Sequence, residues 1–329
     1  WCNVLFFPEV IPHFKMVFPC LSISPRSMEP HPYYSELRCW ENDYIAYFFV
    51  SLFILITAVM LNSLNTMCFY NAAIPNETQV SRLQMNARYT GATESGVVLG
   101  KLIILAFNTG GYTAAWRLPV AAMTFLFGCA STYHVVAIMP WWHDTTQTLF
   151  IFKALILTWT GLMGMLTLAF GGGDDMGLLY YLMLPVLFIS SHLILRWRFF
   201  TILSIASHDL NSSVLAILKI RSITRCFIQW LAQFEGVYVD NSPSLEAEIE
   251  KRNFLTAHAI EIATDRFPNN VDLHILCASY YMTVQLNRVL AYRSLKLAEN
   301  AGGDLDNRFR CQTIRAALDS AADDEMSEE

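Results

Sequence analysis

The sequence predicts an all-α protein, with a polytopic transmembrane helix bundle followed by a cytosolic region of tetratricopeptide-like helical repeats. Three observations predict it: long apolar runs, a charge asymmetry along the chain, and a repeat in the last third. Of the 329 residues 54% are apolar and 15% charged, whereas soluble domains carry about 25% charged residues. Charges occupy 18 of the first 195 positions and 32 of the last 134. This composition excludes a disordered chain, and the net charge of −6 argues against a nucleic-acid binder.

These differences divide the chain into four expected parts. Residues 1–43 contain six prolines, which disfavour helix, so we expect an irregular extracytoplasmic segment there. Residues 44–195 form a transmembrane region of about five helices. A basic juxtamembrane segment with a linker helix follows over 196–242. Residues 243–329 form the repeats and end in an acidic tail.

Five apolar runs approach the roughly 20 residues that a bilayer-spanning helix needs. They cover residues 44–61, 97–112, 118–139, 147–170 and 176–195. The run 97–112 is short and contains a lysine, so a full span and a re-entrant hairpin both stay open for it. A soluble protein with buried core helices is the alternative to the bundle, but four long apolar runs are hard to bury in so short a chain without lipid.

Two lysines, Lys101 and Lys153, lie near the starts of the second and fourth apolar runs. In an up-and-down bundle both fall on one side of the membrane, together with Arg196 and Arg198. An excess of Lys and Arg marks the cytoplasmic side, so we expect the C-terminal region in the cytosol. The two lysines either line a pathway through the membrane or snorkel to the headgroups.

The juxtamembrane segment is locally basic. Its cations are Arg196, Arg198, Lys219, Arg221 and Arg225. They are candidates for contact with acidic lipids, since each basic side chain near such a surface contributes about 1 kcal/mol of attraction. The alternative is that they reflect only the topology of the chain.

The eight cysteines contain no CxxC pair, which argues against a zinc site or a redox dithiol. Cys20 and Cys39 fall on the proposed outer side and are candidates for a disulfide. The chain also lacks the phosphate-binding, metalloprotease, hydrolase and dinucleotide motifs GxxxxGK[ST], HExxH, GxSxG and GxGxxG. We therefore expect neither a cofactor, a metal nor a catalytic centre.

Capping signals place helices after residue 195. Asn211-Ser212-Ser213 opens a helix to about residue 234, and Asn241-Ser242-Pro243 opens the next, which stops at Pro268. Asn269-Asn270 and Asp304 open later ones. Four apolar residues recur 35 positions later: Leu255, Ile260, Ile262 and Ala263 align with Leu290, Leu295, Leu297 and Ala298. This period is typical of tetratricopeptide solenoids; a plain helical bundle with a chance match is the alternative.

The run from Phe267 to Leu276, with Leu295-Lys296-Leu297-Ala298-Glu299 and Leu305 to Phe309, resembles the tetratricopeptide-like region of the TmcB/TmcC (tiny macrocysts) family. Lys101 at the start of an apolar run and Pro140-Trp141-Trp142 between runs resemble its membrane region. The family comprises large polytopic membrane proteins of unicellular eukaryotes, many with a sensory PAS domain. The resemblance implies a signalling or scaffolding role in the plasma or ciliary membrane and supplies no catalytic residues.

Three functions fit these observations. The first is a non-enzymatic integral membrane signalling or scaffold protein whose cytosolic repeats dock protein partners. The second is a channel or transporter subunit, with Lys101 and Lys153 near an aqueous path. The third is a structural subunit of a larger membrane assembly. The expected partners are the bilayer, a protein at the repeats and other subunits of a membrane complex.

Overall fold

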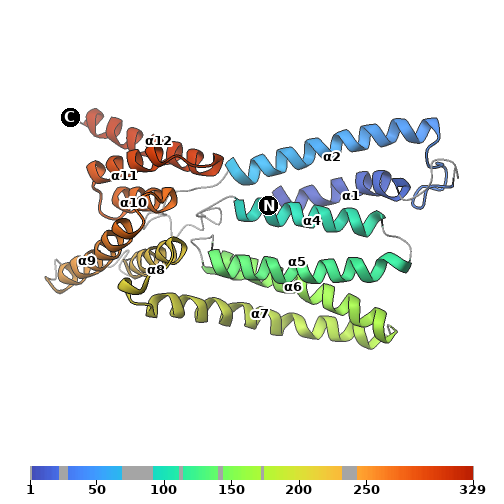
Figure 1. Cartoon of the computed structure of the whole chain (residues 1–329), viewed down its shortest axis with the longest axis horizontal. Coiled ribbons are helices and arrows are strands. Elements are labelled where there is room, and N and C mark those ends of the chain that lie inside the picture. Colours follow the sequence, from blue (N-terminus) through green and yellow to red (C-terminus); the bar gives the residue numbers. More distant parts are fainter. Residues whose placement is uncertain are drawn as a thin grey trace. The chain divides into compact units, whose positions relative to one another are not determined.

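The computed structural model describes residues 2–21, 29–68, 92–110, 114–139, 144–171, 174–231 and 243–328. Of these residues 87% are helical, and over these ranges the structure shows no strand, only an isolated bridge between Pro30 and Arg38 (Figure 1). The all-α prediction is therefore confirmed. Pro140-Trp141-Trp142, residues 111–112 and the linker 232–242 lie outside the described residues.

The helices follow one another along the chain. They are α1 Cys2–Leu21, α2 Asn42–Cys68, α4 Ala92–Gly110, α5 Ala114–Ile138, α6 Asp144–Phe170, α7 Asp174–Ser204, η1 Ser207–Asp209, α8 Ser213–Leu231, α9 Pro243–Arg266, α10 Val271–Thr283, α11 Arg288–Ala301 and α12 Leu305–Glu328. They form two compact units. The first comprises Trp1–Phe69, Ala92–His134 and Phe152–Ser190; the second comprises Tyr70–Gly91, Val135–Ile151 and Ser191–Glu329.

Within the described part of the chain, four helical segments are long and apolar enough to cross a membrane: Asn42–Leu61, Arg117–Ile138, Asp144–Phe170 and Gly177–Ser204. Their mean hydropathy lies between 1.5 and 2.4, yet the chain itself buries at most 22% of each apolar window. Contiguous apolar surface of this extent is rare on soluble monomers. The helix α4, which contains most of the expected run 97–112, is not among the four.

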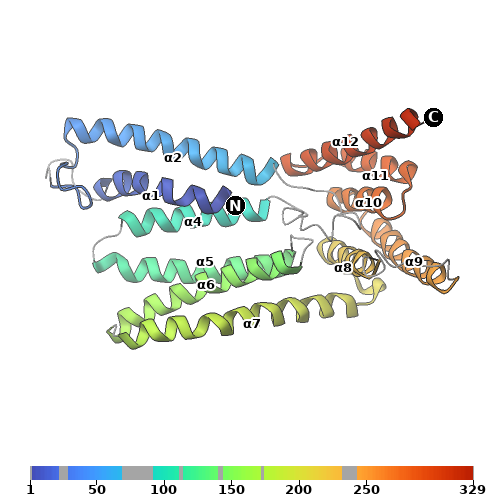
Figure 2. The same cartoon turned by 180° about the vertical axis from the view of Figure 1, so that it is seen from behind.

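The first unit contains a helix where an irregular segment was expected. Residues Cys2–Leu21 form α1, so the expectation for 1–43 is wrong over this range. A proline fixes φ near the helical value, and apolar helices tolerate proline where neighbouring groups take up the freed backbone positions. Phe14 and Val17 of α1 are buried against Leu55 of α2 and Leu102 of α4. The two views agree that these three helices lie side by side (Figures 1 and 2).

The chain reverses between α1 and α2 in a corner fastened by a disulfide. Cys20 and Cys39 are bonded to each other and are fully buried. Trp40 Nε1 donates a hydrogen bond of 3.1 Å to the carbonyl of Cys20. The buried Tyr44 hydroxyl donates to the carbonyl of Met16 over 3.1 Å. The Trp40 bond supplies a donor to a carbonyl in the last turn of α1, where no later helical amide is available to donate.

Glycines allow α5 and α6 to approach closely. A Cβ at Gly128 would collide with the backbone of Thr158, and one at Gly161 with the backbone of Phe125. Thr132 and Thr158 hydroxyl groups lie 3.5 Å apart in the same contact. Small residues have this role in apolar helix pairs, because they let the two backbones approach closely and make more van der Waals contacts. Such contacts stabilise the pair where association displaces no water.

The second unit contains the caps that the sequence predicts. The Ser212 hydroxyl accepts from the amide of Leu215 at the start of α8. Asn270 accepts from Leu273 over 2.8 Å at α10, and Asp304 accepts from Asn307 over 2.9 Å at α12. Asn287 caps α11 likewise, and Gly302 ends it with φ at 76°. Each side chain satisfies an amide that the helix leaves without an internal acceptor.

The helix α7 extends beyond the expected end of the fifth apolar run. It continues to Ser204, so Arg196 and Arg198 belong to its last turns. The helix therefore passes the boundary expected at residue 195 without ending there. Backbone hydrogen bonding does not stop where apolar composition stops, because arginine is itself a good helix former.

Substitution of Gly128 by leucine should loosen the contact between α5 and α6. The new side chain has no room against Thr158, so we expect Gly128→Leu to destabilise the protein by about 1–3 kcal/mol. Gly177→Leu is the matched control, because a Cβ there meets nothing within 4 Å. Thermal unfolding of both variants in one detergent measures the difference. Equal midpoints would show that α5 and α6 do not pack at Gly128.

Candidate functional site

The helix α8 carries three cationic side chains that are buried. Lys219, Arg221 and Arg225 are each 6–7% exposed. Arg221 and Arg225 are four residues apart and share one side of the helix, whereas Lys219 lies nearer the opposite side. Charged side chains are rarely buried unless other groups compensate the charge, so their contacts are the first candidate for a functional arrangement.

Arg221 caps the C-terminus of α5. Its guanidinium donates to the carbonyl of Ile138 over 3.1 Å and to that of Met139 over 2.6 Å. Met139 is buried and adopts a left-handed backbone with φ at 47°, a conformation that ends helices. The carbonyls of a last helical turn have no amide partners within the helix, and the negative end of the helix dipole favours a cation there.

Arg225 pairs with the first turn of α6. Its guanidinium forms an ion pair with Asp144, whose side chain is 53% exposed. It also lies 5.4 Å from the centre of the Phe199 ring in α7. Burial lowers the pKa of Arg225 to about 10, so the side chain still carries its charge at neutral pH. The carboxylate and the ring are the groups that compensate this charge.

Lys219 completes the arrangement at α7. Its ammonium group donates to the carbonyl of Leu203 in the last turn of that helix. One helix therefore supplies a cation to the C-terminus of α5, to the N-terminal turn of α6 and to the C-terminus of α7. We call Lys219, Arg221, Arg225 and Asp144 the α8 junction.

The structure thus places the five basic residues named from the sequence in two groups. Lys219, Arg221 and Arg225 bind protein carbonyls and a carboxylate, which accounts for them without lipid. Arg196 is exposed and Arg198 half-buried on α7. Contact with acidic lipid therefore stays a prediction that suits these two better than the other three.

The remaining surface of α8 packs on the C-terminal helices. Ala216, Ile220 and Ile228 lie in one apolar cluster with residues of α9 and α10, among them Ala259 and Leu276. The helix is therefore held both by buried charged side chains and by apolar contact. It is the element of the second unit that joins the ends of the apolar helices to the C-terminal helices.

Lys101 and Lys153 come together in the first unit. Their side chains lie close enough to interact electrostatically, although they belong to α4 and α6. Two ammonium groups at this range repel each other, and more strongly where the surroundings are apolar. This proximity is not visible in the sequence, where 52 residues separate the two.

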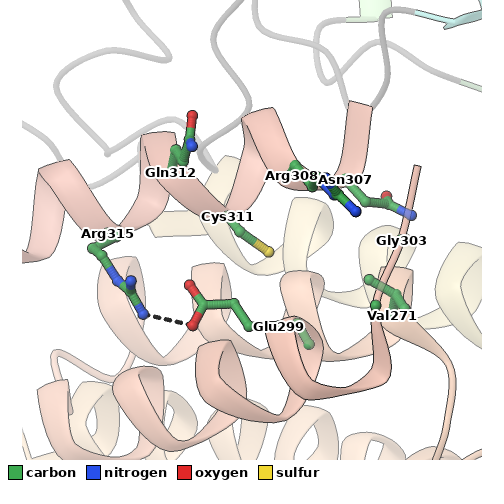
Figure 3. A pocket seen from close by; sticks show the side chains of 10 residues that line it. Val271, Glu299, Gly303, Asn307, Arg308, Cys311, Gln312 and Arg315 are labelled. Atoms are coloured by element: carbon green, nitrogen blue, oxygen red, sulfur yellow. Dashed lines mark hydrogen bonds and ion pairs between the residues drawn. The ribbon is translucent and has the colours of Figure 1, made fainter. Parts of the chain in front are cut away.

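A pocket of about 340 Å³ opens between α11, α12 and the start of α10. Figure 3 shows Arg315 extended towards Glu299 across it, and the two side chains are 2.6 Å apart. The lining thiol of Cys311 is buried, which raises its pKa. The only carboxylate of the lining is thus engaged and its thiol is protonated at neutral pH. Among the residues that line this pocket we find no activated nucleophile.

No group of three or more His, Cys, Asp or Glu side chains is placed to hold a metal ion within the described ranges. No family model, no curated protein and no solved structure matches the chain.

Sequence reasoning missed Asp144 and Arg310. Arg310 is 1% exposed and donates to Asp272 over 2.6 Å, which ties α12 to the first turn of α10. The sequence contained a signal for Arg310. Cys311, Ile314 and Leu318 recur at the spacing of one buried side of a helix, and Arg310 lies next to the first of them. For Asp144 the signal was an acidic residue at the start of a helix.

The ion pair of Arg225 should respond unequally to loss of each partner. Asp144→Asn leaves a buried guanidinium without its carboxylate, which we expect to cost about 3 kcal/mol. Arg225→Met removes the buried charge and leaves a half-exposed carboxylate, at a cost of about 1 kcal/mol. Glu299→Gln, in a more exposed pair, is the control and should change little. Thermal unfolding of the three variants in one detergent measures the order of their losses in stability. A larger loss for Arg225→Met than for Asp144→Asn would contradict the assignment.

Proposed function

We propose that the chain is an integral membrane protein with a non-catalytic signalling or scaffolding role, and that it docks protein partners through α9–α12 on the cytosolic side. The four apolar helices support the membrane placement. The cations Lys101, Lys153, Arg196 and Arg198 support the orientation through the positive-inside rule. The resemblance of residues 267–309 to the TmcB/TmcC family agrees with this role, and membership of that family is part of the proposal.

The observation that carries the proposal is a repeat in burial. Four positions of α9 that are less than 10% exposed recur in α11 after 35 residues, again less than 10% exposed. They are Thr256, Ala259, Ile260 and Ala263, matched by Ala291, Ser294, Leu295 and Ala298. This equivalence of packing, beyond the equivalence of residue types, supports two copies of one helix-pair unit at the tetratricopeptide period.

The arrangement of the apolar clusters also supports a stack. Leu273 and Cys277 of α10 pack in the cluster with α8 and α9, whereas Ile275 and Ala278 pack in the cluster with α11 and α12. The helix α10 is therefore covered from two sides, as an inner helix of a solenoid is. The positions of α12 that lie 35 residues after Leu273 and Cys277 are Arg308 and Gln312, and both are exposed. Such a polar face is the one that a stack presents to water.

A second candidate function has an observation of its own. The proximity of Lys101 and Lys153 in the first unit is what an anion pathway or anion site within a bundle needs. A channel or transporter subunit is therefore kept as the second proposal.

Deletion of residues 243–329 tests the docking role. We expect a protein partner to co-purify in fixed ratio with the full chain and to be lost from the truncated chain, because the repeats supply its binding surface. The readout is quantitative mass spectrometry of both preparations, restricted to preparations in which the truncated chain stays monodisperse in detergent. A partner retained by the truncated chain would place docking elsewhere.

Flux measurements distinguish the second candidate. We expect liposomes that contain the purified chain to pass chloride no faster than empty liposomes. A flux that is present and falls in Lys153→Gln, but not in the control Lys251→Gln on the exposed side of α9, would favour the channel reading over the scaffold.

A further inference from the structure

The corner between α1 and α2, residues 29–41, contains a histidine that is almost completely buried. His31 is 2% exposed. Its ring lies among tyrosine rings, with centroids 5.1 Å from Tyr34, 5.8 Å from Tyr44 and 6.4 Å from Tyr33. Buried polar atoms are almost always hydrogen-bonded, so the partners of the two ring nitrogens determine which protonation state the corner accommodates.

Both ring nitrogens of His31 have backbone partners. The Nδ1 atom accepts hydrogen bonds from the amides of Tyr33 over 3.1 Å and of Tyr34 over 3.2 Å. The Nε2 atom lies 3.4 Å from the carbonyl of Met16 in α1, to which it can only donate. A nitrogen that accepts from two amides carries no proton, so the ring is neutral and its one N–H group is on Nε2.

The surroundings of His31 favour this neutral form. Burial lowers the pKa of His31 below the ordinary value of 6.5, and the carbonyls of Lys15 and Met16 raise it by less. No carboxylate of the described residues is among the groups that shift this pKa. The Lys15 ammonium lies 5.3 Å from the centre of the Tyr33 ring, and the group that α2 turns towards His31 is the uncharged ring of Tyr44. A positive charge on His31 therefore lacks a compensating acid among these neighbours.

Protonation of Nδ1 is incompatible with the turn that follows His31. An imidazolium has an N–H group on both nitrogens and accepts no hydrogen bond. The amides of Tyr33 and Tyr34 would lose their acceptor and face a third donor. Two backbone donors left without an acceptor in a buried place make the closed turn unfavourable, so a proton on Nδ1 favours a conformation in which the turn is open.

The rest of the corner depends on the same residue. The amide of His31 donates to the carbonyl of Leu37 over 2.8 Å, which pairs the two sides of the corner. The amide of Cys39 donates to the carbonyl of Glu29 over 2.9 Å in the same pairing. Opening of the turn at His31 therefore loosens the segment that contains Cys39 and its disulfide with Cys20.

We propose that the corner formed by residues 29–41 is a proton-sensitive latch, in which uptake of a proton by His31 opens the turn to Tyr34 and releases the corner from the end of α1. The open form binds the proton more tightly, because its histidine is solvated. The contribution of His31 to the closed form is complete above pH 6.5 and is lost as the pH falls from 6.5 through the lowered pKa. The latch responds to acid on the side of the membrane where the corner lies, and it is independent of docking by α9–α12.

Reduction of the Cys20–Cys39 disulfide by a water-soluble phosphine, in the full chain in detergent, measures the opening. His31→Asn is the matched variant, because an asparagine oxygen accepts from amides two and three residues later and does not titrate. We expect equal rates for both chains at about pH 7.5, and a rate about tenfold higher for the unsubstituted chain at about pH 5. The ratio of the two rates cancels the pH dependence of the reductant.

The control for this measurement is His258→Asn, which changes an exposed histidine of α9. It should be reduced as the unsubstituted chain is at every pH. A ratio of the unsubstituted chain to His31→Asn that stays constant with pH, or a pH response that His258→Asn also abolishes, would overturn the latch.

Amide hydrogen exchange of the unsubstituted chain tests the same opening without a variant. After correction for intrinsic exchange, we expect the peptide that contains Tyr33 and Tyr34 to lose up to about tenfold of its protection per pH unit in the acid range. The peptide of α11, which contains no histidine, should keep its protection. Full protection of the corner at about pH 5, or an equal loss in α11, would refute a local latch at His31.

Discussion

Helix ends in apolar surroundings need partners for their last backbone groups, and the buried cations of α8 supply them. Water cannot replace the guanidinium of Arg221 as the donor at the end of α5, because both Arg221 and Met139 are buried. Lys219 serves the end of α7 in the same way, whereas Arg225 forms an ion pair with the side chain of Asp144 in the first turn of α6. A buried charge that has lost its partner costs several kcal/mol, so these contacts determine where α8 lies and, through its apolar side, where α9 and α10 lie.

The boundaries of the C-terminal helices could be predicted from single residues, because a cap acts over three positions. Ser212, Asn270 and Asp304 are each followed three residues later by the amide that they bind. The helix α1 could not be predicted in that way. Its prolines are unfavourable locally, and what stabilises it is the packing of Phe14 and Val17 on α2 and α4, residues distant in the sequence.

The candidate site could be predicted only in part, again because its contacts join residues that are distant in the sequence. Composition identified Lys219, Arg221 and Arg225 as an unusual group, and position after an apolar run suggested lipid. Their actual acceptors are carbonyls more than 15 residues away in the case of Lys219 and more than 80 in the case of Arg221. A carbonyl has no signature in the sequence, because every residue carries one. Charged side chains next to apolar runs therefore admit a lipid and a capping interpretation equally until the fold is known.

The helix α8 makes two kinds of contact, apolar packing and charged hydrogen bonds, and the two favour different forms of the proposed function. Apolar packing can slide by small amounts, whereas a guanidinium that binds two carbonyls in fixed directions cannot move without losing both bonds. Displacement of α8 relative to the ends of α5, α6 and α7 would thus break several charged hydrogen bonds within the second unit at once. A rigid attachment of this kind suits the proposed scaffold role, in which the C-terminal helices are held in place. If a signal passes through the chain, the sliding apolar contacts among α8, α9 and α10 are the place for the movement, because they leave every buried charge paired.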